Sequence, residues 1–307
     1  MAPMADVTDF AFRALVAARG RPDVFWTEFV SADGLYHTRE IQKIPDALNP
    51  LLRDLQFTED QRPIVAQIFS SKPEMIAYAA KLIEKLKFDG VDLNMGCPDR
   101  SIEKQDAGAA LIKNPKLAAK IIKAAQEASD LPVSVKTRIG YNKESFDEWL
   151  TALLEANPAA ITLHLRTRKE MSAVPADWEQ MKKAVEIRNK INPKVLLIGN
   201  GDVQDLEDAR AKAAEFGCNG VMIGRAMFGN PWILNRQQPT INLQQKLDAL
   251  IELAYGFEKI SPPKNFAILK KHIKAFVTGF AGAADLRARL METTSASELE
   301  KAIHLYT

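Results

Sequence analysis

Short runs of apolar, often β-branched residues alternate with amphipathic stretches along most of this 307-residue chain. Continuous apolar runs of this length are typical of strands buried on both faces, as in a parallel sheet. The MAPM start is counted as the first of eight predicted strands. The other seven are predicted at 24–30, 63–69, 90–94, 132–138, 159–164, 194–199 and 219–223.

The stretches between these strands repeat their apolar residues at helical spacing. Two of them open with a proline, Pro73 and Pro115, which is favoured at a first helical position. Eight alternating units over about 230 residues favour a closed (β/α)8 TIM barrel over an open doubly wound sheet. Helices are predicted at 73–87, 115–129, 144–156, 176–190 and 204–216.

After residue 235 the pattern becomes entirely helical. Asn242 can cap a helix at 243–258, the SPP at 261–263 interrupts the chain, and a second amphipathic helix is predicted over 264–280. A shorter pair is predicted near 282–291 and 295–306. We therefore expect an α/β barrel domain at 1–238, followed by a small all-helical C-terminal domain at 239–307.

The net charge of +2 is unevenly distributed. Before residue 240 there are 32 basic and 32 acidic residues, whereas after it there are 9 and 7. Residues 259–289 alone hold seven basic residues and one acid, Asp285. A solvated helix face is the ordinary explanation of such a stretch, and a site for a polyanion is the alternative.

Several classes of protein are not expected. The N-terminus shows no signal peptide, and no apolar run approaches the ~20 residues of a membrane helix. Two cysteines cannot build a disulfide framework, and no CxxC spacing suggests zinc. We expect a monomeric, soluble protein of the reducing cytoplasm, without a metal.

Polar residues follow most of the predicted strands, where a barrel carries its chemistry. Glycine turns after the last two strands can bind phosphate through backbone N–H groups at helix N-termini, with Arg225 adding a bidentate contact; the alternative is that they are only tight turns. The polar strand ends are Gln67, Asn94–Cys97, Lys136 with Arg138, His164 with Arg166, Asn200–Asp202, and Gly224 with Arg225.

Three of these residues are chemically distinctive. Cys97 lies between Gly96 and Pro98, a context that suits an accessible thiol acting as nucleophile or proton donor, whereas Cys218 is expected to be buried. Lys136 is either a Schiff-base nucleophile, as in aldolases, or a cation facing an anionic cofactor. His164 is either a core histidine or a ligand contact.

A set of motifs resembles, in order and spacing, the tRNA-dihydrouridine synthases. The stretch DLNMGCP at 92–98 is the most specific of them, and the resemblance covers essentially the whole chain. The other motifs are MAPMADVTD at the N-terminus, TEF at 27–29, AQIF at 66–69, VKTRIG at 135–140, HLRTR at 164–168, NGD at 200–202 and IGRAMFGNPWI at 223–233.

The resemblance implies an FMN barrel that reduces the C5=C6 bond of selected tRNA uridines, with NADPH recharging the flavin. It implies that Cys97 protonates C5, that Asn94 orients the uracil and that Arg166 contacts substrate. Lys136 would stabilise the reduced flavin electrostatically. The implied FMN contacts are Pro3, Met4, Ala5, Gln67, Lys136, His164, Asn200, Gly201, Asp202, Gly224 and Arg225.

A uracil must leave its stack to reach the flavin, and phosphate contacts elsewhere must offset that cost. The basic stretch is the expected source of these contacts. Three alternatives stay open: an FMN barrel acting on a small pyrimidine, as dihydroorotate dehydrogenases do, an aldolase or isomerase using Lys136, and an inactive tRNA-binding module. The basic residues expected to contact tRNA are Lys264, Lys270, Lys271, Lys274, Arg287 and Arg289.

Overall fold

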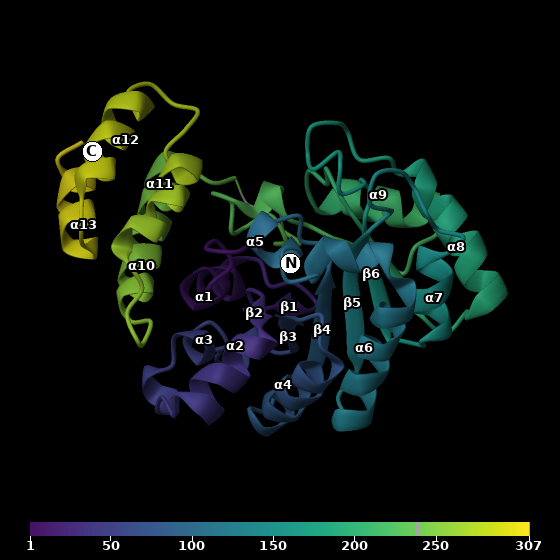
Figure 1. The fold of residues 1–307 in the computed structure, drawn as a ribbon. Helices are drawn as coiled ribbons and strands as arrows, with labels where there is room; N and C mark the ends of the chain where they lie inside the picture. The colour runs from purple at the N-terminus through teal and green to yellow at the C-terminus, as the bar shows by residue number, and fades with distance from the viewer. Residues whose placement is uncertain (238–239, 307) are drawn as a thin grey trace.

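The computed structural model describes residues 1–237 and 240–306. Its strands form one parallel sheet in the order β1-β3-β4-β5-β6-β7-β8, with β2 also paired to β3. The sheet curls into the barrel seen in Figure 1, which confirms the predicted fold class. The strands are β1 (Phe25–Trp26), β2 (Val30–Ser31), β3 (Ile64–Phe69), β4 (Gly90–Met95), β5 (Val133–Arg138), β6 (Ala160–His164), β7 (Leu196–Asn200) and β8 (Gly220–Met222).

The N-terminal residues lie where the sheet closes, although they do not form the predicted strand. The Ala2 N–H donates to the Ile223 carbonyl (2.8 Å), and the Met1 amino group donates to the Val24 carbonyl (3.2 Å). The chain start therefore bridges the two edge strands, β8 and β1. With only single hydrogen bonds to each side, no ladder forms, so the strand prediction for MAPM is wrong while its position in the barrel is right.

The predicted strand 24–30 is divided into β1 and β2. The Thr27 N–H still reaches the Val65 carbonyl (3.0 Å), but the Thr27 hydroxyl accepts the Gln67 N–H (3.1 Å). The Gln67 N–H therefore donates to a side-chain hydroxyl, whereas in a regular ladder it would donate to a backbone carbonyl. This substitution interrupts the strand just before Glu28.

Helices surround the barrel close to the predicted positions. Pro73 and Pro115 occupy first-turn positions, as expected. The helix predicted from residue 144 begins only at Trp149, and an unpredicted helix, α1 (Phe10–Arg19), is capped by Asp9, whose carboxylate accepts the Phe12 N–H (3.0 Å). The outer helices are α4 (Pro73–Lys85), α6 (Pro115–Ala128), α7 (Trp149–Glu155), α8 (Glu179–Ile191) and α9 (Leu206–Phe216). Shorter helical segments are α2 (Ala32–Tyr36), α3 (Pro50–Arg53) and α5 (Arg100–Glu103).

The pleat of each strand separates an apolar outer face from a more polar inner face. On β5, Val133 and Val135 join the large core under the helices, whereas Ser134 and Lys136 make their polar contacts across the barrel interior. A separate apolar cluster of Ala2, Trp26 and Met222 fills another part of the barrel. Polar side chains on the inner face, such as Ser134 and Lys136, therefore lead toward the carboxyl end of the barrel.

Among the residues described after the barrel, the α-helices are α10 (Leu243–Glu258), α11 (Lys270–Phe276), α12 (Ala283–Glu292) and α13 (Ala296–His304). They lie beside α1 and away from α7 and α8 (Figure 1). Asn242 and Gln245 form a capping box at the start of α10, as the sequence predicts. The Arg19 guanidinium pairs with both carboxylate oxygens of Glu252 (3.1 and 2.5 Å), joining α1 to α10.

The helix predicted over 264–280 is right only in its centre. Asn265 caps a short 3-10 turn at Phe266–Ile268, and α11 ends at Phe276 before Gly279, whose φ is +82°. The domain boundary predicted at 238/239 lies outside the described residues and stays a prediction. No helix among the residues described is both long and apolar enough to cross a bilayer.

Candidate active site

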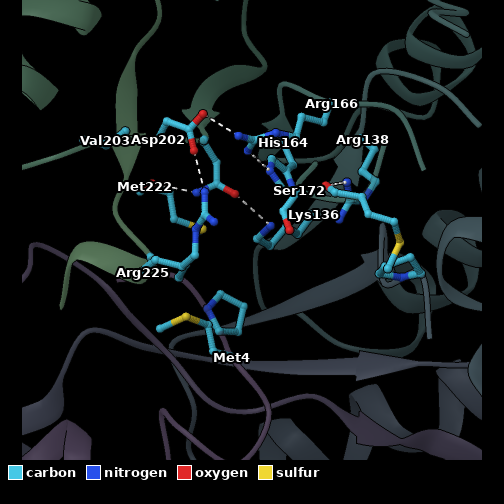
Figure 2. Close-up of a pocket in the computed structure, with 17 residues that line it drawn as sticks. Met4, Lys136, Arg138, His164, Arg166, Ser172, Asp202, Val203, Met222 and Arg225 are labelled. Atoms are coloured by element: carbon cyan, nitrogen blue, oxygen red, sulfur yellow. Dashed lines mark hydrogen bonds and ion pairs between the residues drawn. The ribbon is translucent and has the colours of Figure 1, made fainter. Parts of the chain in front are cut away.

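The polar strand ends converge on one cavity of about 350 Å³ at the carboxyl ends of β5 to β8. Its volume lies within the range of small-molecule sites, roughly 300–1,000 Å³. Figure 2 shows Met4 across this cavity from His164. The lining residues are Ala2, Pro3, Met4, Pro98, Lys136, Arg138, His164, Arg166, Met171, Ser172, Asn200, Gly201, Asp202, Val203, Met222, Gly224 and Arg225.

Lys136 points into this cavity from the inner face of β5. Its Nζ donates to Asn200 Oδ1 (3.2 Å), and Asn200 Nδ2 in turn donates to the Met222 carbonyl (2.8 Å). Burial, with a further contribution from the Arg138 charge, lowers the pKa of Lys136 to about 8. An ammonium has three donors, so two remain for a ligand.

Arg166, Asp202 and Arg225 form a chain of charges along another wall. Asp202 Oδ2 pairs with Arg166 Nη2 and accepts the Ala176 N–H (2.8 Å), while Asp202 Oδ1 lies 2.5 Å from Arg225 Nη2. The Arg166 hydrogen bond lowers the pKa of Asp202 to about 2. Arg166 is almost fully buried, whereas the Arg225 side chain is 66% exposed. Arg166 therefore braces the wall, and Arg225 is accessible to an anion.

His164 lies next to this chain and is neutral. Its Nε2 lies 3.1 Å from Arg166 Nη1, and burial, with the Lys136 and Arg138 charges, lowers the pKa of His164 to about 2. A guanidinium can only donate, so Nε2 accepts and the ring proton is assigned to Nδ1. The histidine contributes a donor, not a charge.

The turn after β7 is tight, as its glycine predicts, whereas the turn after β8 has room for a Cβ at Gly224. Gly201 has φ +135°, and a Cβ there would lie 2.6 Å from the Ala176 side chain. A Cβ on Gly224 would lie 3.4 Å from Ala2 Cβ.

The expectation that both turns lead into helix N-termini holds only in part. The turn after β8 enters one 3-10 turn at Arg225–Met227. After β7 the chain reaches α9 four residues past Asp202, and the Asp205 carboxylate already caps that helix. Acidic Glu207 and Asp208 also occupy its first turn. The N-terminus of α9 is therefore not open to an anion, and Arg225 with the turns would have to bind one.

Cys97 lies in the turn after β4, and Asn94 holds that turn. Asn94 Oδ1 accepts the N–H groups of Gly96 (3.2 Å) and Cys97 (2.9 Å), and its Nδ2 donates to Gln67 Oε1 (3.1 Å). Burial raises the pKa of the Cys97 thiol, which keeps it protonated. Cys97 packs beside the apolar pair Phe69 and Ile102, and its neighbour Pro98, not Cys97 itself, lines the cavity.

Gln67, expected to touch a cofactor, is buried below the cavity. Its Nε2 donates to Asp92 Oδ2 (2.6 Å), and Ser134 Oγ donates to Asp92 Oδ1 (2.5 Å). Burial raises the pKa of Asp92. Gln67 and Asn94 are therefore joined in one buried hydrogen-bond network beside the site, and neither lines the cavity. Ala5 is exposed and is also absent from the lining, so the expected contacts of Gln67 and Ala5 with a cofactor stay predictions.

Arg138, the last residue of β5, lines the cavity and has a structural role that its position at a strand end does not predict. Its Nε donates to the Gly96 carbonyl (2.9 Å), and its Nη1 donates to the carbonyls of Thr167 (3.1 Å) and Met171 (2.9 Å). It thus ties the Cys97 turn to the loop after β6. That loop contributes Met171 and Ser172 to the lining, and no motif identified them.

The basic stretch is less accessible than its composition predicts. Lys264 is buried against Glu28 (2.8 Å) and Asp54 (3.0 Å), so its expected contact with tRNA is wrong. Lys270 donates to the Met291 carbonyl (2.5 Å), and Lys271 pairs with Asp6 (2.9 Å). Lys274 is exposed and has no hydrogen bond or ion pair with another described residue. None of these lysines lines the cavity.

Within the described ranges, no three His, Cys, Asp or Glu side chains are placed to hold a metal. A parallel (β/α)8 barrel with a cation-lined cavity at the carboxyl ends of its strands defines a class of phosphate- or cofactor-binding enzymes. The sequence pattern described as dihydrouridine synthase (Dus) matches residues 1–306. The chain belongs to this family, as its motifs predict.

Curated relatives agree with this assignment. The chain is 39% identical over 302 residues to a probable tRNA-dihydrouridine synthase of Staphylococcus aureus, covering 97% of this chain and 89% of the relative. It is also 39% identical over 305 residues to probable tRNA-dihydrouridine synthase 2 of Bacillus subtilis, covering 97% and 90%.

Solved structures resemble the fold at low sequence identity. Morphinone reductase in complex with tetrahydroNAD is 13% identical with a TM-score of 0.50, covering 79% of this chain and 87% of that chain. The 6-hydroxypseudooxynicotine amine oxidase of Pseudomonas geniculata is 11% identical with a TM-score of 0.53, covering 89% and 52%. These likenesses support the barrel fold alone.

Proposed function

We propose that this protein reduces the C5=C6 bond of uridines in tRNA to 5,6-dihydrouridine, with FMN as cofactor and NADPH as reductant. The proposal rests on one observation, that the turn carrying Cys97 lies beside Lys136. Asn94 and Lys136 are register partners on the neighbouring strands β4 and β5. The protonated thiol and the cation therefore stand at one edge of the barrel, next to the cavity. The relatives named above support tRNA as the substrate.

The residues of the cavity fit FMN. Lys136 keeps free donors for the polar edge of a flavin, and Asn200 and His164 offer further polar groups beside it. Arg225 with the turns at Gly201 and Gly224 suits the phosphate end. A Cβ at Gly201 would lie 2.6 Å from the Ala176 side chain, so only glycine fits this turn. Pro3 and Met4 form the opposite, apolar wall. When bound, the flavin supplies the hydride that adds to C6 of the uracil.

Cys97 supplies the proton that completes the reduction at C5. Its raised pKa keeps the thiol protonated until the carbon accepts the proton, and its partial exposure allows water to protonate the thiolate again. Asn94 positions this step by holding the backbone N–H of Cys97 (2.9 Å). Arg138 fixes the same turn from the other side through the Gly96 carbonyl.

Binding of tRNA is assigned to the helical segment after the barrel, with Lys274 as an exposed cation on α11. Lys270 and Lys271 join it only when phosphates replace the Met291 carbonyl and the Asp6 carboxylate as their partners. Arg166 acts on substrate indirectly, because its guanidinium is held by Asp202 and His164. We place the reaction in the cytoplasm, with a monomer as the active unit and the barrel and helices as separate domains.

The direct test is to purify the full chain and incubate it with FMN, NADPH and unmodified tRNA. Flavin absorbance that copurifies with the protein and dihydrouridine mapped in the tRNA are the expected results. A colourless protein that gains no flavin contradicts the cofactor. Reduction of free uridine or oxidation of dihydroorotate at rates above that on tRNA contradicts the substrate.

A further inference from the structure

Lys264 fastens the segment between α10 and α11 to the barrel. Its Nζ lies 2.8 Å from Glu28 Oε2 and 3.0 Å from Asp54 Oδ1. The Lys264 side chain is 3% exposed and the Glu28 side chain 5%. Removing two charges from water is unfavourable unless close partners compensate, and removal of one partner leaves the other charge uncompensated. The contact is therefore a buried ion pair, unlike the solvated pairs elsewhere on the surface.

Two neighbouring contacts give the same segment a defined place. Gln56 Nε2 donates to the Ser261 carbonyl (2.5 Å), and Arg53 Nη1 donates to the Pro263 carbonyl (3.2 Å). Arg53, Asp54 and Gln56 belong to the end of α3 and the residues just after it. Residues 261–264 are thus held at successive points along a short stretch of the barrel.

The second carboxylate oxygen of Glu28 reaches the N-terminal turn. Glu28 Oε1 accepts the Val7 N–H (3.1 Å), which is also 3.1 Å from the Met4 carbonyl. The Met4 N–H donates to Thr8 Oγ1 (2.9 Å), so residues 4–8 form a closed turn. Met4, at the start of this turn, lines the cavity. A chain of contacts therefore runs from Lys264 through Glu28 and Val7 to the cavity wall.

The same turn has a second contact with the C-terminal segment. Lys271 pairs with Asp6 (2.9 Å), and Asp6 adopts φ +57°, a conformation that non-glycine residues rarely take. The turn is therefore fixed by lysines on both sides of the 3-10 turn that precedes α11. The segment that holds it also carries Lys274.

We infer that Lys264 is a positioning residue: through Glu28 it fixes the turn at 4–8, so that the C-terminal segment and one wall of the cavity hold each other in place. Lys264 touches neither the cavity nor an exposed surface. Its removal acts on the cavity because Glu28 then keeps a buried carboxylate without its ammonium and no longer holds the Val7 N–H in place.

The inference is tested by hydrogen exchange of the 1–12 peptide and by the dissociation constant of FMN, both on the full chain. We compare Lys264→Met, Lys264→Arg, Glu28→Gln and, as a matched control, Lys301→Met, an exposed lysine of α13. Glu28→Gln breaks this series of contacts with little change in volume. Val7 and Lys264 donate to different carboxylate oxygens of Glu28, and the amide replaces one of these acceptors with an NH2 donor.

Lys264→Met and Glu28→Gln should each speed exchange at residues 4–8 and raise the FMN dissociation constant, by roughly tenfold. Lys264→Arg should recover part of both effects, and Lys301→Met should match the wild type. Unchanged exchange and FMN affinity in a folded Glu28→Gln variant overturn the inference, and so does an equal effect of Lys301→Met. The FMN measurement rests on the proposed function; if the wild type binds no FMN, that proposal fails and exchange alone decides this one.

Discussion

At the scale of single residues, substitution of Cys97 best distinguishes a loss of catalysis from a loss of binding. Its thiol packs beside Phe69 and Ile102 and does not line the cavity. Cys97→Ala should therefore retain FMN and tRNA affinity while losing dihydrouridine formation by roughly 10²–10⁴-fold, the usual contribution of a general acid. Dihydrouridine formed in a single turnover, with the flavin reduced beforehand, is the measurement.

The matched control for that variant is Cys218→Ala. Cys218 is the other free cysteine and is buried. Its thiol donates to the Gly220 carbonyl at the amino end of β8, whereas the cavity lies at the carboxyl end. Full activity of Cys97→Ala, or an equal loss in Cys218→Ala, removes Cys97 from the role of proton donor.

Lys136 gives a prediction about stability and pH. Burial lowers its folded pKa to about 8 from an unfolded value of 10.5, so the unfolded chain binds more protons between these values. The free energy of unfolding therefore rises with pH across that window. The destabilisation caused by burying the charged lysine is fully present below pH 8. Without FMN, Lys136→Met should be more stable than wild type at pH 7, by on the order of 3 kcal/mol.

The measurement is urea unfolding of both FMN-free proteins at pH 7 and at pH 10. The advantage of Lys136→Met should shrink at the higher pH, because the wild-type lysine is then mostly neutral in the folded state. An advantage that is constant with pH means that packing, not the buried charge, separates the two proteins. With FMN added, the order should reverse, since the variant lacks the cation that the cofactor meets.

At the scale of elements, the turn that carries Cys97 depends on a glycine in the 3-10 helix beyond it. Gly108 has φ +60°, and a Cβ there would lie 2.7 Å from the Cys97 carbonyl and 2.8 Å from an Ile102 methyl group. Gly108→Ala should cost about 1–3 kcal/mol of stability and displace Cys97, lowering activity as well.

Gly217→Ala is the control for this prediction. Gly217 has φ +68°, but the nearest atom to its added Cβ is a Val185 methyl group 3.9 Å away. It should show the cost of backbone conformation, about 1 kcal/mol, without loss of activity. Thermal unfolding and dihydrouridine formation measure both effects; equal losses of activity in the two variants contradict the role assigned to Gly108.

The elements also show what a sequence can predict and why. The outer faces of β3 to β7 are buried by helices, which is why these strands are visible in the sequence as short apolar runs between amphipathic stretches. The strand expected at 24–30 is interrupted because the Thr27 hydroxyl takes the Gln67 N–H, a tertiary contact that no local pattern contains. The short α11 has a similar origin, since Asn265 caps a separate 3-10 turn within a continuous amphipathic pattern.

The residues of the site also divide into those that the sequence predicts and those that only the structure shows. Lys136, His164 and Asn200 were found because polar residues at strand ends point into a barrel. Gln67 was expected at a strand end, but β3 continues for two residues beyond it, and its side chain is bound by Asp92 and Asn94. The sequence around Gln67 does not show how far along the barrel axis it lies. Met171 and Ser172 lie on a loop held in place by Arg138, so only the fold brings them to the site.

At the scale of the whole molecule, the uneven charge acquires a structural meaning. Of the lysines in the basic stretch, Lys264 is used for docking, Lys270 donates to the Met291 carbonyl and Lys271 pairs with Asp6. This leaves Lys259 and Lys274 exposed. The count of basic residues therefore overstates the surface available to RNA. Charge reversal at Lys274 should weaken tRNA binding by roughly tenfold and lower the slope of log affinity against log salt by about 1.

Lys123→Glu makes the same change in net charge on α6, on the outside of the barrel. Affinities for tRNA at two salt concentrations, with FMN content as a folding check, compare the two variants. If placement of charge governs binding, Lys123→Glu leaves both affinity and salt slope near the wild-type values. If both variants lose affinity equally, long-range attraction by the total charge explains binding, and the C-terminal helices have no special part in it. Because the catalytic barrel is balanced in charge, we expect the first result.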